Sequence, residues 1–453
     1  MMLNYWLLRH AVRLAILALA ALALASMTLT QASNHTRPAD IRVMLEQQGD
    51  GALRITYDLK NPRKALLFGA LAAGHRARRW AIETPGFQLA RLDDGDRITR
   101  NDGAKFDRVV LIASPDLVRI QKNYQPIAAY GAGGVMVYTG HFWPLTARGG
   151  RVNTTFSFIP GPGAKAVAFG ARADRLVDWR SPMAHPAFVY MGPLQPVETH
   201  EVMAVMDGAA PQWISDEFYA LTPRVFAHLA GALGFSLAVK PNLFLAAPLG
   251  REEGRLSYSG DALPAQFQIT LEGGAWRERS PKALGIFRRS TIHEAVHLWQ
   301  AAARPGSDAV AGWIHEGAAD AIAAEALLAL GLWDAADYTA DFDRAREECA
   351  AELRHGPLAT AEARGRFRAL YACGHVIAVA VSWADGGTVS DFWKGFIAEA
   401  KSGGYTQGDF YDYVAKRGGE RDFVAALRYF VRTPLANPTR EVARLLDAAG
   451  APS

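Results

Sequence analysis

Hydrophobic and polar residues alternate with a period of two in much of the region between residues 40 and 200. In the first clear segment, Ile55, Tyr57 and Leu59 fall on one face of an extended chain and their polar neighbours fall on the other. Clusters of Gly, Pro, Asn and Asp separate such segments, which is typical of a β-sandwich. The clearest predicted strands are 54–59, 108–112, 134–138 and 153–159.

From about residue 212 the pattern changes to helical periodicity. Apolar residues between 216 and 233 recur every three or four positions, which predicts an amphipathic helix with a break at Pro223. Two short apolar segments, 242–247 and 266–271, predict strands. Strands followed by a long helical region indicate an α+β fold. Helices are predicted at 333–354, 361–385, 389–401, 407–417, 420–432 and 438–448.

Length and composition describe a globular protein. The 453 residues suffice for two or three domains, and 50% of them are hydrophobic and 21% charged, which excludes a disordered chain. The formal net charge is +4, and no basic stripe with interleaved aromatic residues follows the chain. The sequence therefore predicts no nucleic-acid partner.

Residues 1–32 have the pattern of a secretory signal peptide. Arg9 and Arg13 precede an apolar core at 14–25. The alternative is an uncleaved membrane anchor, but this core is shorter than the roughly 20 residues that a membrane span needs. No second long apolar run follows. The sequence predicts an exported protein, periplasmic or secreted, without a stable membrane span after the signal is removed.

The strongest chemical signal is the segment Thr-Ile-His-Glu-Ala-Val-His-Leu-Trp at 291–299. His293 and His297 are four residues apart, so on a helix they lie on one face and can share one tetrahedral ion such as Zn²⁺. Glu294 lies beside them and can act as a base toward water held by that ion. A chance match is the alternative, since the chain is long.

A second carboxylate-bearing segment follows at 313–320. It predicts a helix that presents Glu316 to the two histidines as the third ligand, and Asp320 lies one turn further on the same face. A carboxylate there can accept the free ring N–H of a ligating histidine. The alternative is a solvated helix face, but the neighbouring residues are apolar, and burying a charged side chain among them is costly unless it is paired. The sequence predicts one Zn²⁺ per chain, held by His293, His297 and Glu316.

These motifs resemble the gluzincin metallopeptidases. Trp-Ile-His-Glu-Gly-Ala at 313–318 is similar to segments of the aminopeptidase N and glycyl aminopeptidase families, and Tyr-Ala-Cys-Gly-His-Val at 371–376 resembles their Tyr-x-Lys-Gly segment. The resemblance covers 210 to 435. It implies that Tyr371 stabilises the transition state. The alternatives are that Tyr371 is a core aromatic residue, or that His375 is the donor.

The resemblance also implies the domain order. The expected α+β chain has an N-terminal β-sandwich-like domain, then a thermolysin-like catalytic domain, and then a helical C-terminal part. The predicted boundaries are 1–32 for the signal peptide, 33–205 for the β-rich domain, 206–332 for the catalytic domain and 333–453 for the helical part.

In the resembled families an edge strand lies along the active site and pairs with the substrate backbone. The matching positions here are Gly273, Gly274 and Ala275, which are therefore predicted to bind substrate. Trp276 and Arg277 replace the family's Met-Glu, so the glutamate that holds a free amine is missing from its place. An ordinary glycine turn is the alternative.

Cys349 and Cys373 are the two cysteines of the chain. An even number of cysteines in an exported protein favours a disulfide, and both fall in predicted helices that an antiparallel arrangement would bring together. Two buried free thiols are the alternative. Two cysteines are too few for a structural zinc site.

The combined interpretation is an exported zinc metallopeptidase that acts on a peptide or protein substrate. Glu294 would be the general base and Tyr371 the oxyanion donor. Two alternatives stay open at this point. One is a degenerate relative that binds peptide without turnover, and the other is a hydrolase of a non-peptide bond such as an ester or epoxide.

Overall fold

The computed structural model describes residues 38–450, except residue 50 and the segments 72–73, 116–123, 304–310, 400–404 and 418–420. The predicted signal peptide at 1–32 lies outside these residues. The described chain forms two compact units, and each is discontinuous in sequence. Unit 1 contains the described residues up to Ser114 together with Thr139–Pro160 and Asp174–Pro186; unit 2 contains Pro115–Tyr138, Gly161–Ala173 and the chain from Ala187 onward.

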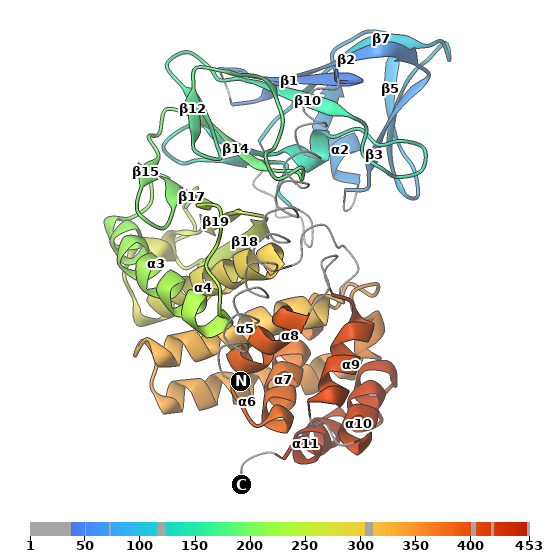
Figure 1. The fold of residues 1–453 in the computed structure, drawn as a ribbon. Coiled ribbons are helices and arrows are strands. Elements are labelled where there is room, and N and C mark those ends of the chain that lie inside the picture. Colours follow the sequence, from blue (N-terminus) through green and yellow to red (C-terminus); the bar gives the residue numbers. More distant parts are fainter. Residues whose placement is uncertain are drawn as a thin grey trace, which may run out of the picture. The chain divides into compact units, whose positions relative to one another are not determined.

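Unit 1 is a β-rich unit of two sheets (Figure 1). The six-stranded sheet has the order β13-β10-β1-β2-β7-β4, and the three-stranded sheet has the order β3-β6-β5. Ile55, Tyr57 and Leu59 of β2 are buried, as their alternation predicts. The elements are β1 (Ile41–Gln47), β2 (Leu53–Arg63), β3 (Ala65–Gly69), α2 (His75–Arg79), β4 (Trp80–Ile82), β5 (Phe87–Arg91), β6 (Gly95–Arg100), β7 (Phe106–Ala113), η2 (Thr139–Phe142), β10 (Thr154–Ile159) and β13 (Leu176–Trp179).

Unit 2 contains two five-stranded sheets, with orders β12-β11-β14-β9-β8 and β15-β16-β17-β19-β18. An aromatic cluster joins them, with Tyr138 and Phe188 from the first sheet and Phe244 from the second. The strands are β8 (Ile127–Ala129), β9 (Val135–Tyr138), β11 (Lys165–Ala168), β12 (Ala171–Ala173), β14 (Phe188–Gly192), β15 (Val197–Glu198), β16 (Met203–Met206), β17 (Asn242–Ala246), β18 (Ser257–Leu263) and β19 (Gln266–Glu272).

The second sheet of unit 2 has a parallel centre and one antiparallel edge. β16, β17 and β19 run parallel, and β18 pairs antiparallel with β19 at the end of the sheet. The strands β17 and β19 are buried along almost their whole length, as expected for central strands covered on both faces. β18 is mostly half-buried, and among the described residues no strand pairs with its other side.

The helix α3 lies between β16 and β17 in sequence, and after β19 the remaining elements of the described chain are helical (Figure 1). The helix α3 is continuous, so the predicted break at Pro223 is wrong. Its apolar face is buried on both sides of the proline, and the Thr222 hydroxyl donates to the carbonyl of Phe218 (2.7 Å) just before it. The helical elements are α3 (Gln212–Leu233), η3 (Gly274–Arg277), α4 (Pro281–Ala303), α5 (Gly312–Ala329), α6 (Ala335–Leu353), η4 (Leu358–Thr360), α7 (Phe367–Asp385), α8 (Val389–Glu399), α9 (Gln407–Lys416), α10 (Arg421–Arg432) and α11 (Pro438–Ala448).

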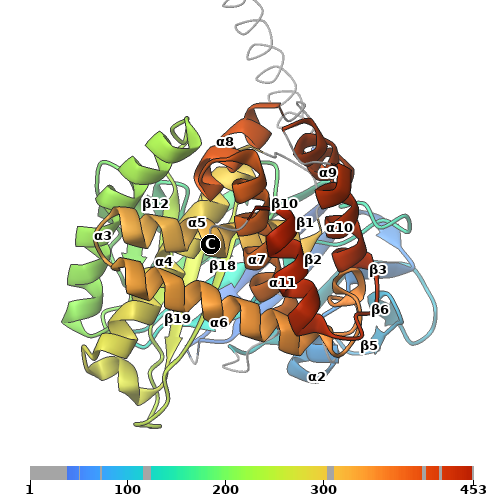
Figure 2. The same ribbon diagram turned by 90° about the horizontal axis from the view of Figure 1, so that it is seen from below.

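The helix α7 is the centre of this helical region. It packs against α5, α6 and α8, and α6 in turn packs against α11, which lies beside it in Figure 2. Among the described residues, α7 alone is long and apolar enough to cross a membrane. Of its apolar 18-residue stretch, 72% is buried inside the protein. Packing within unit 2 therefore accounts for its apolar surface.

The α+β architecture is confirmed. The structure groups strands β8, β9, β11, β12 and β14 with unit 2, although their sequences have the same period-2 pattern as those of unit 1. Their aromatic side chains explain the grouping, because they share a core with β16 and β17. The predicted boundary between residues 205 and 206 falls within β16.

Candidate metal centre

The helix α4 carries the two histidines. Its start is capped by Ser280, whose hydroxyl accepts the N–H of Ala283 (3.1 Å), and Pro281 occupies the first helical position. His293 and His297 then lie on successive turns, with rings 4.6 Å apart. Both are buried. The i, i+4 spacing in the sequence therefore produces the shared face that it predicts.

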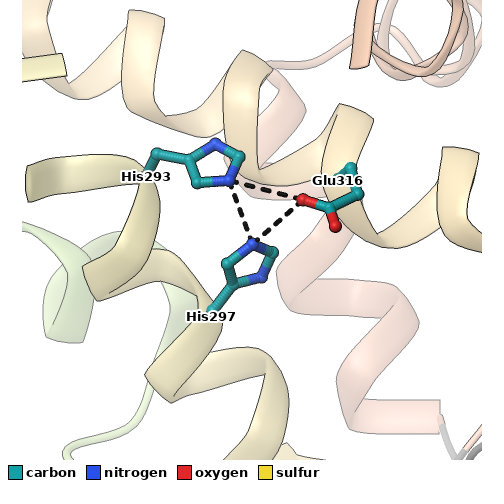
Figure 3. A group of neighbouring side chains, drawn as sticks. All are labelled: His293, His297 and Glu316. Carbon is teal, nitrogen blue, oxygen red and sulfur yellow. Dashed lines mark hydrogen bonds and ion pairs between the residues drawn. The ribbon is translucent and has the colours of Figure 1, made fainter. Parts of the chain in front are cut away.

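The helix α5 presents Glu316 to these histidines (Figure 3). The Glu316 Oε2 atom lies 3.5 Å from His293 Nε2 and 3.3 Å from His297 Nε2. The two Nε2 atoms are 3.0 Å apart. The structure thus brings together the three residues predicted to hold zinc, and they form the only such group of three in the part of the chain that the structure describes.

Each histidine has a hydrogen-bond acceptor behind it. His293 Nδ1 lies 2.8 Å from Asp320 Oδ1, and His297 Nδ1 lies 2.6 Å from Gln300 Oε1. Asp320 occupies the position predicted for it. Gln300 was missed, although its place three residues after His297 on the same helix face is a usable signal.

The donor set fits a tetrahedral metal ion. Because Asp320 and Gln300 accept from the Nδ1 atoms, both Nε2 lone pairs point toward the same place as the Glu316 carboxylate. Three electron pairs that converge in this way repel one another unless a cation lies between them. Bonds of about 2.0–2.1 Å to zinc place neighbouring ligand atoms about 3.3 Å apart. The observed separations of 3.0, 3.3 and 3.5 Å agree with that spacing.

The electrostatics of the centre also favour positive charge. Burial disfavours the imidazolium of His293, but hydrogen bonds to Asp320 and Glu316 outweigh burial and raise the pKa of His293 to about 10. Burial likewise raises the pKa of Asp320, but Arg289 and His293 more than offset this and hold that pKa well below its usual range. Asp320 is therefore an ionised acceptor.

Glu294 lines the same cavity as His293, His297 and Glu316 and lies against the edge strand β18. It is buried, and a side chain at Gly260 of β18 would lie 2.1 Å from its Oε1 atom. A β-carbon at 260 would therefore displace the Glu294 carboxylate from its present place. The structure gives the edge position to β18. It places Gly273, Gly274 and Ala275 beyond β19 and in η3, outside the residues that line the cavity at the metal centre.

The helix α7 brings Tyr371 to the metal centre. The Tyr371 ring lies 5.8 Å from the His293 ring, and its hydroxyl donates a hydrogen bond to Glu316. Burial, together with the nearby carboxylates, raises the pKa of Tyr371 well above its usual value, so the hydroxyl keeps its proton at neutral pH. His375 lies one turn deeper, with Nδ1 4.0 Å from Asp341 Oδ2. Of these two residues, the structure therefore places Tyr371 at the ligands.

Two glycines let α5 and α7 pack closely. A side chain at Gly317 would lie 2.1 Å from the backbone of Gly374, and one at Gly374 would lie 2.1 Å from the carbonyl of Trp313. Gly317 follows the ligand Glu316, and Gly374 lies three residues after Tyr371. The crossing of the two helices therefore sets the separation of the ligand and the hydroxyl. The neighbouring Cys373 forms a disulfide with Cys349 of α6, as predicted.

Comparison with known proteins gives a likeness in fold. No family model and no curated protein matches the sequence. An aminopeptidase N family protein from Idiomarina loihiensis superposes with a TM-score of 0.63 at 12% identity, over 89% of this chain and 78% of that chain. Leukotriene A4 hydrolase from Saccharomyces cerevisiae superposes with a TM-score of 0.53 at 12% identity, over 88% of this chain and 68% of that one. The fold is gluzincin aminopeptidase-like.

This gluzincin aminopeptidase-like fold has a cavity of about 1210 Å³ at the candidate metal centre. The three ligands, Glu294 and Tyr371 line it, together with β18 residues Gly260 and Asp261. Tyr124 and Gln125 also line it, from the segment before β8. The sequence did not reveal these two residues, because they lie far from the helices in sequence and belong to no motif. The Tyr124 hydroxyl donates to the carbonyl of Ala262 (3.3 Å), which joins this segment to the edge strand.

Proposed function

We propose that the protein is a zinc metallopeptidase, exported from the cytoplasm, that hydrolyses peptide bonds. The observation that carries the proposal is the convergence of His293, His297 and Glu316 at the separations expected around a tetrahedral ion. A base and a hydroxyl donor lie beside that place in the same cavity. Zinc there would lower the pKa of a bound water and polarise a bound carbonyl.

Glu294 has the position of a general base. It lines the same cavity as the ligands, and its carboxylate lies against the edge strand along which a substrate would lie. It would accept the proton of the attacking water and deliver a proton to the departing amine. The carboxylate lies so near β18 that a β-carbon at 260 would be 2.1 Å from its Oε1 atom.

Tyr371 would stabilise the oxyanion. In the structure its hydroxyl donates to Glu316. A substrate oxygen that becomes negative beside the ligands would compete for the same donor, so the hydrogen bond would strengthen as charge develops. Because the phenol is neutral, it adds no charge to the ground state.

The cavity and the open edge of β18 suit an extended peptide. The free side of β18 has backbone groups that a peptide can pair with, and this is how many proteins bind extended segments. Asp261 of this strand is held by Gln268 (2.6 Å) and lines the cavity. We infer that a peptide or protein substrate lies along β18 with its scissile carbonyl toward Glu294. Export is inferred from residues 1–32.

The test is peptide cleavage combined with metal analysis. Wild-type protein should contain about one zinc per chain and cleave members of a peptide library with free or blocked amino ends. Glu294→Gln should keep zinc and lose turnover, because an amide cannot accept the proton. Glu348→Gln is the matched control, since Glu348 lines the same cavity from α6. That variant should keep zinc and most of the activity.

Three results would contradict the proposal. Wild-type protein that binds no zinc would remove the metal site. A zinc-loaded Glu294→Gln variant with wild-type turnover would remove the base. Zinc-loaded protein that cleaves no peptide, but hydrolyses esters or epoxides, would keep the centre and change the substrate.

A further inference from the structure

A chain of partly buried and buried charges extends from the candidate metal centre, behind His293. Asp320 uses its two oxygens differently: Oδ1 bonds His293 Nδ1 (2.8 Å), and Oδ2 pairs with Arg289 Nη2 (3.4 Å). Arg289 uses its other terminal nitrogen to donate to Asp341 Oδ1. The side chain of Asp341 is only 2% exposed. The groups belong to three helices, with Arg289 on α4, Asp320 on α5 and Asp341 on α6.

The position of Arg289 follows from the helix that carries the ligands. Arg289 precedes His293 by four residues on α4, so the two side chains lie on the same face. Asp320 follows Glu316 by four residues on α5, for the same reason. The helices α4 and α5 thus face each other at two levels that are one helical turn apart. His293 contacts Glu316 at one level, and Arg289 pairs with Asp320 at the other.

Arg289 pairs with the Asp320 oxygen that does not bond His293, and this suggests a role for the arginine. One acceptor atom suffices to fix the tautomer of a ligating histidine. A carboxylate held only by that bond can still turn about its last side-chain torsion, which is broad. A guanidinium on the other oxygen fixes the carboxylate plane. Asp341 in turn holds the guanidinium, because burying an unpaired arginine would be costly.

We propose that Arg289 is a positioning residue of the metal centre, which fixes Asp320 in the orientation that directs the His293 Nε2 lone pair toward the ion. Asp341 extends this support to α6, the helix joined to α7 by the disulfide. The inference rests on the proposed zinc site and adds two residues to it. Neither Arg289 nor Asp341 would itself hold the ion.

The chain offers a matched control in the adjacent residue. Arg288 is also on α4, and its Nε donates to Glu217 Oε1 of α3 (2.6 Å). The exposed fractions of the two arginine side chains are 22% for Arg288 and 21% for Arg289. Replacing either one removes a charge and a partly buried ion pair from the same helix. Only Arg289 is connected to a ligand.

The experiment measures zinc affinity of the full-length protein by competition with a chromophoric chelator. Arg289→Met should bind zinc about 10- to 100-fold more weakly than wild type, the usual effect of losing support behind a ligand. Arg288→Met should stay within about threefold of wild type, whatever its effect on thermal stability. Cobalt(II) substituted for zinc should show a changed visible spectrum in Arg289→Met and an unchanged one in Arg288→Met. Arg289→Lys, which keeps the charge, should recover part of the affinity.

Equal affinity in Arg289→Met and wild type, with identical cobalt spectra, would overturn the inference. So would an equal loss in the two methionine variants, since that would reflect general destabilisation. If Arg289→Met does not fold, Asp341→Asn and Arg289→Lys decide the matter, and wild-type affinity in both would overturn it. Absence of zinc binding in the wild-type protein would instead contradict the proposed function itself.

Discussion

Each compact unit pairs an arginine with a buried aspartate, and the two pairs differ in what surrounds them. In unit 1, Arg76 pairs with Asp96, and their side chains are 1% and 2% exposed. Arg76 also donates to the carbonyls of Gly69 and His141, and it lies against the rings of Phe68 and Trp80. In unit 2, Arg289 joins Asp341 to Asp320, which bonds a histidine whose other nitrogen faces a second histidine.

The pKa values of Arg76 and Arg289 are shifted in opposite directions. Burial lowers the pKa of Arg76, and Asp96 only partly offsets this. Burial also lowers the pKa of Arg289, but Asp320 and Asp341 outweigh it and the pKa is raised. A buried ion pair is by itself weak evidence for function. The two pairs differ in the groups to which they lead. Arg76 bonds backbone carbonyls that only join parts of unit 1. Arg289 leads through Asp320 to His293, where the lone pairs of two histidines and Glu316 point to one place.

Removing a ligand gives the largest expected effect on this comparison. His297→Ala and Glu316→Ala should each lower the zinc content from about one per chain to nearly none, because three protein ligands are needed to hold the ion. Turnover should fall with it. Metal analysis of purified, folded protein measures the change. Full zinc occupancy in both variants would show that these residues are not the ligands.

Removing the arginine of unit 1 should affect stability but not the metal centre. Arg76→Met leaves Asp96 buried without its partner, so the free energy of unfolding should fall by about 3–5 kcal/mol. Denaturant unfolding measures it. The folded fraction should keep its zinc. Arg100→Met is the control, because the pair of Arg100 with Asp102 is exposed and should contribute nothing measurable. Zinc loss in fully folded Arg76→Met would remove the distinction between the two units.

Tyr371→Phe should reduce turnover about a hundredfold, equivalent to about 3 kcal/mol, with little change in KM. The ring remains, and only the hydroxyl, the proposed oxyanion donor, is lost. Tyr338→Phe on α6 removes a hydroxyl that does not line the cavity and should leave turnover unchanged. Steady-state kinetics on zinc-loaded protein tests both. Unchanged turnover in Tyr371→Phe, with loss of activity in His375→Ala, would transfer the role to His375.

The smallest expected effect is a pH dependence that arises beside Arg289. Burial, with Arg289 nearby, lowers the pKa of His375 to about 4. The unfolded chain binds the proton near pH 6.5, so between these values it holds more protons than the folded protein, and stability is lost as pH falls from 6.5 through 4. The loss should reach about 2 kcal/mol between pH 7.5 and pH 5. His375→Gln should lack this part of the slope. An identical pH slope in that variant would show that His375 does not carry it.

The sequence revealed the parts of the centre that follow from local spacing. His293, Glu294 and His297 form one helical motif, and Glu316 and Asp320 repeat the same i, i+4 relation on the next helix. Long-range placement was less accessible. β18 is mostly polar and is interrupted by Gly260, so it lacks the alternation that marks a strand, and the edge position was sought near Gly273 instead.

The division of the β-strands was also beyond the sequence, since strands of both units share one pattern. Their assignment depends on which aromatic side chains meet, such as Tyr138 and Phe188 with Phe244. The ion pair of Arg289 with Asp341 could not be predicted either, because it also depends on long-range packing. Each is an ordinary charged residue on its own helix until tertiary packing joins α4 to α6.

The crossing of α5 and α7 at Gly317 and Gly374 has a consequence for judging other sequences. At either position even a methyl group would meet backbone at 2.1 Å, so any other residue must push the helices apart. Such a shift would separate Tyr371 from Glu316 without altering a ligand. A sequence that keeps the zinc motif but replaces either glycine is therefore expected to retain metal and lose rate, so the glycine pair separates active relatives from those that only bind the ion.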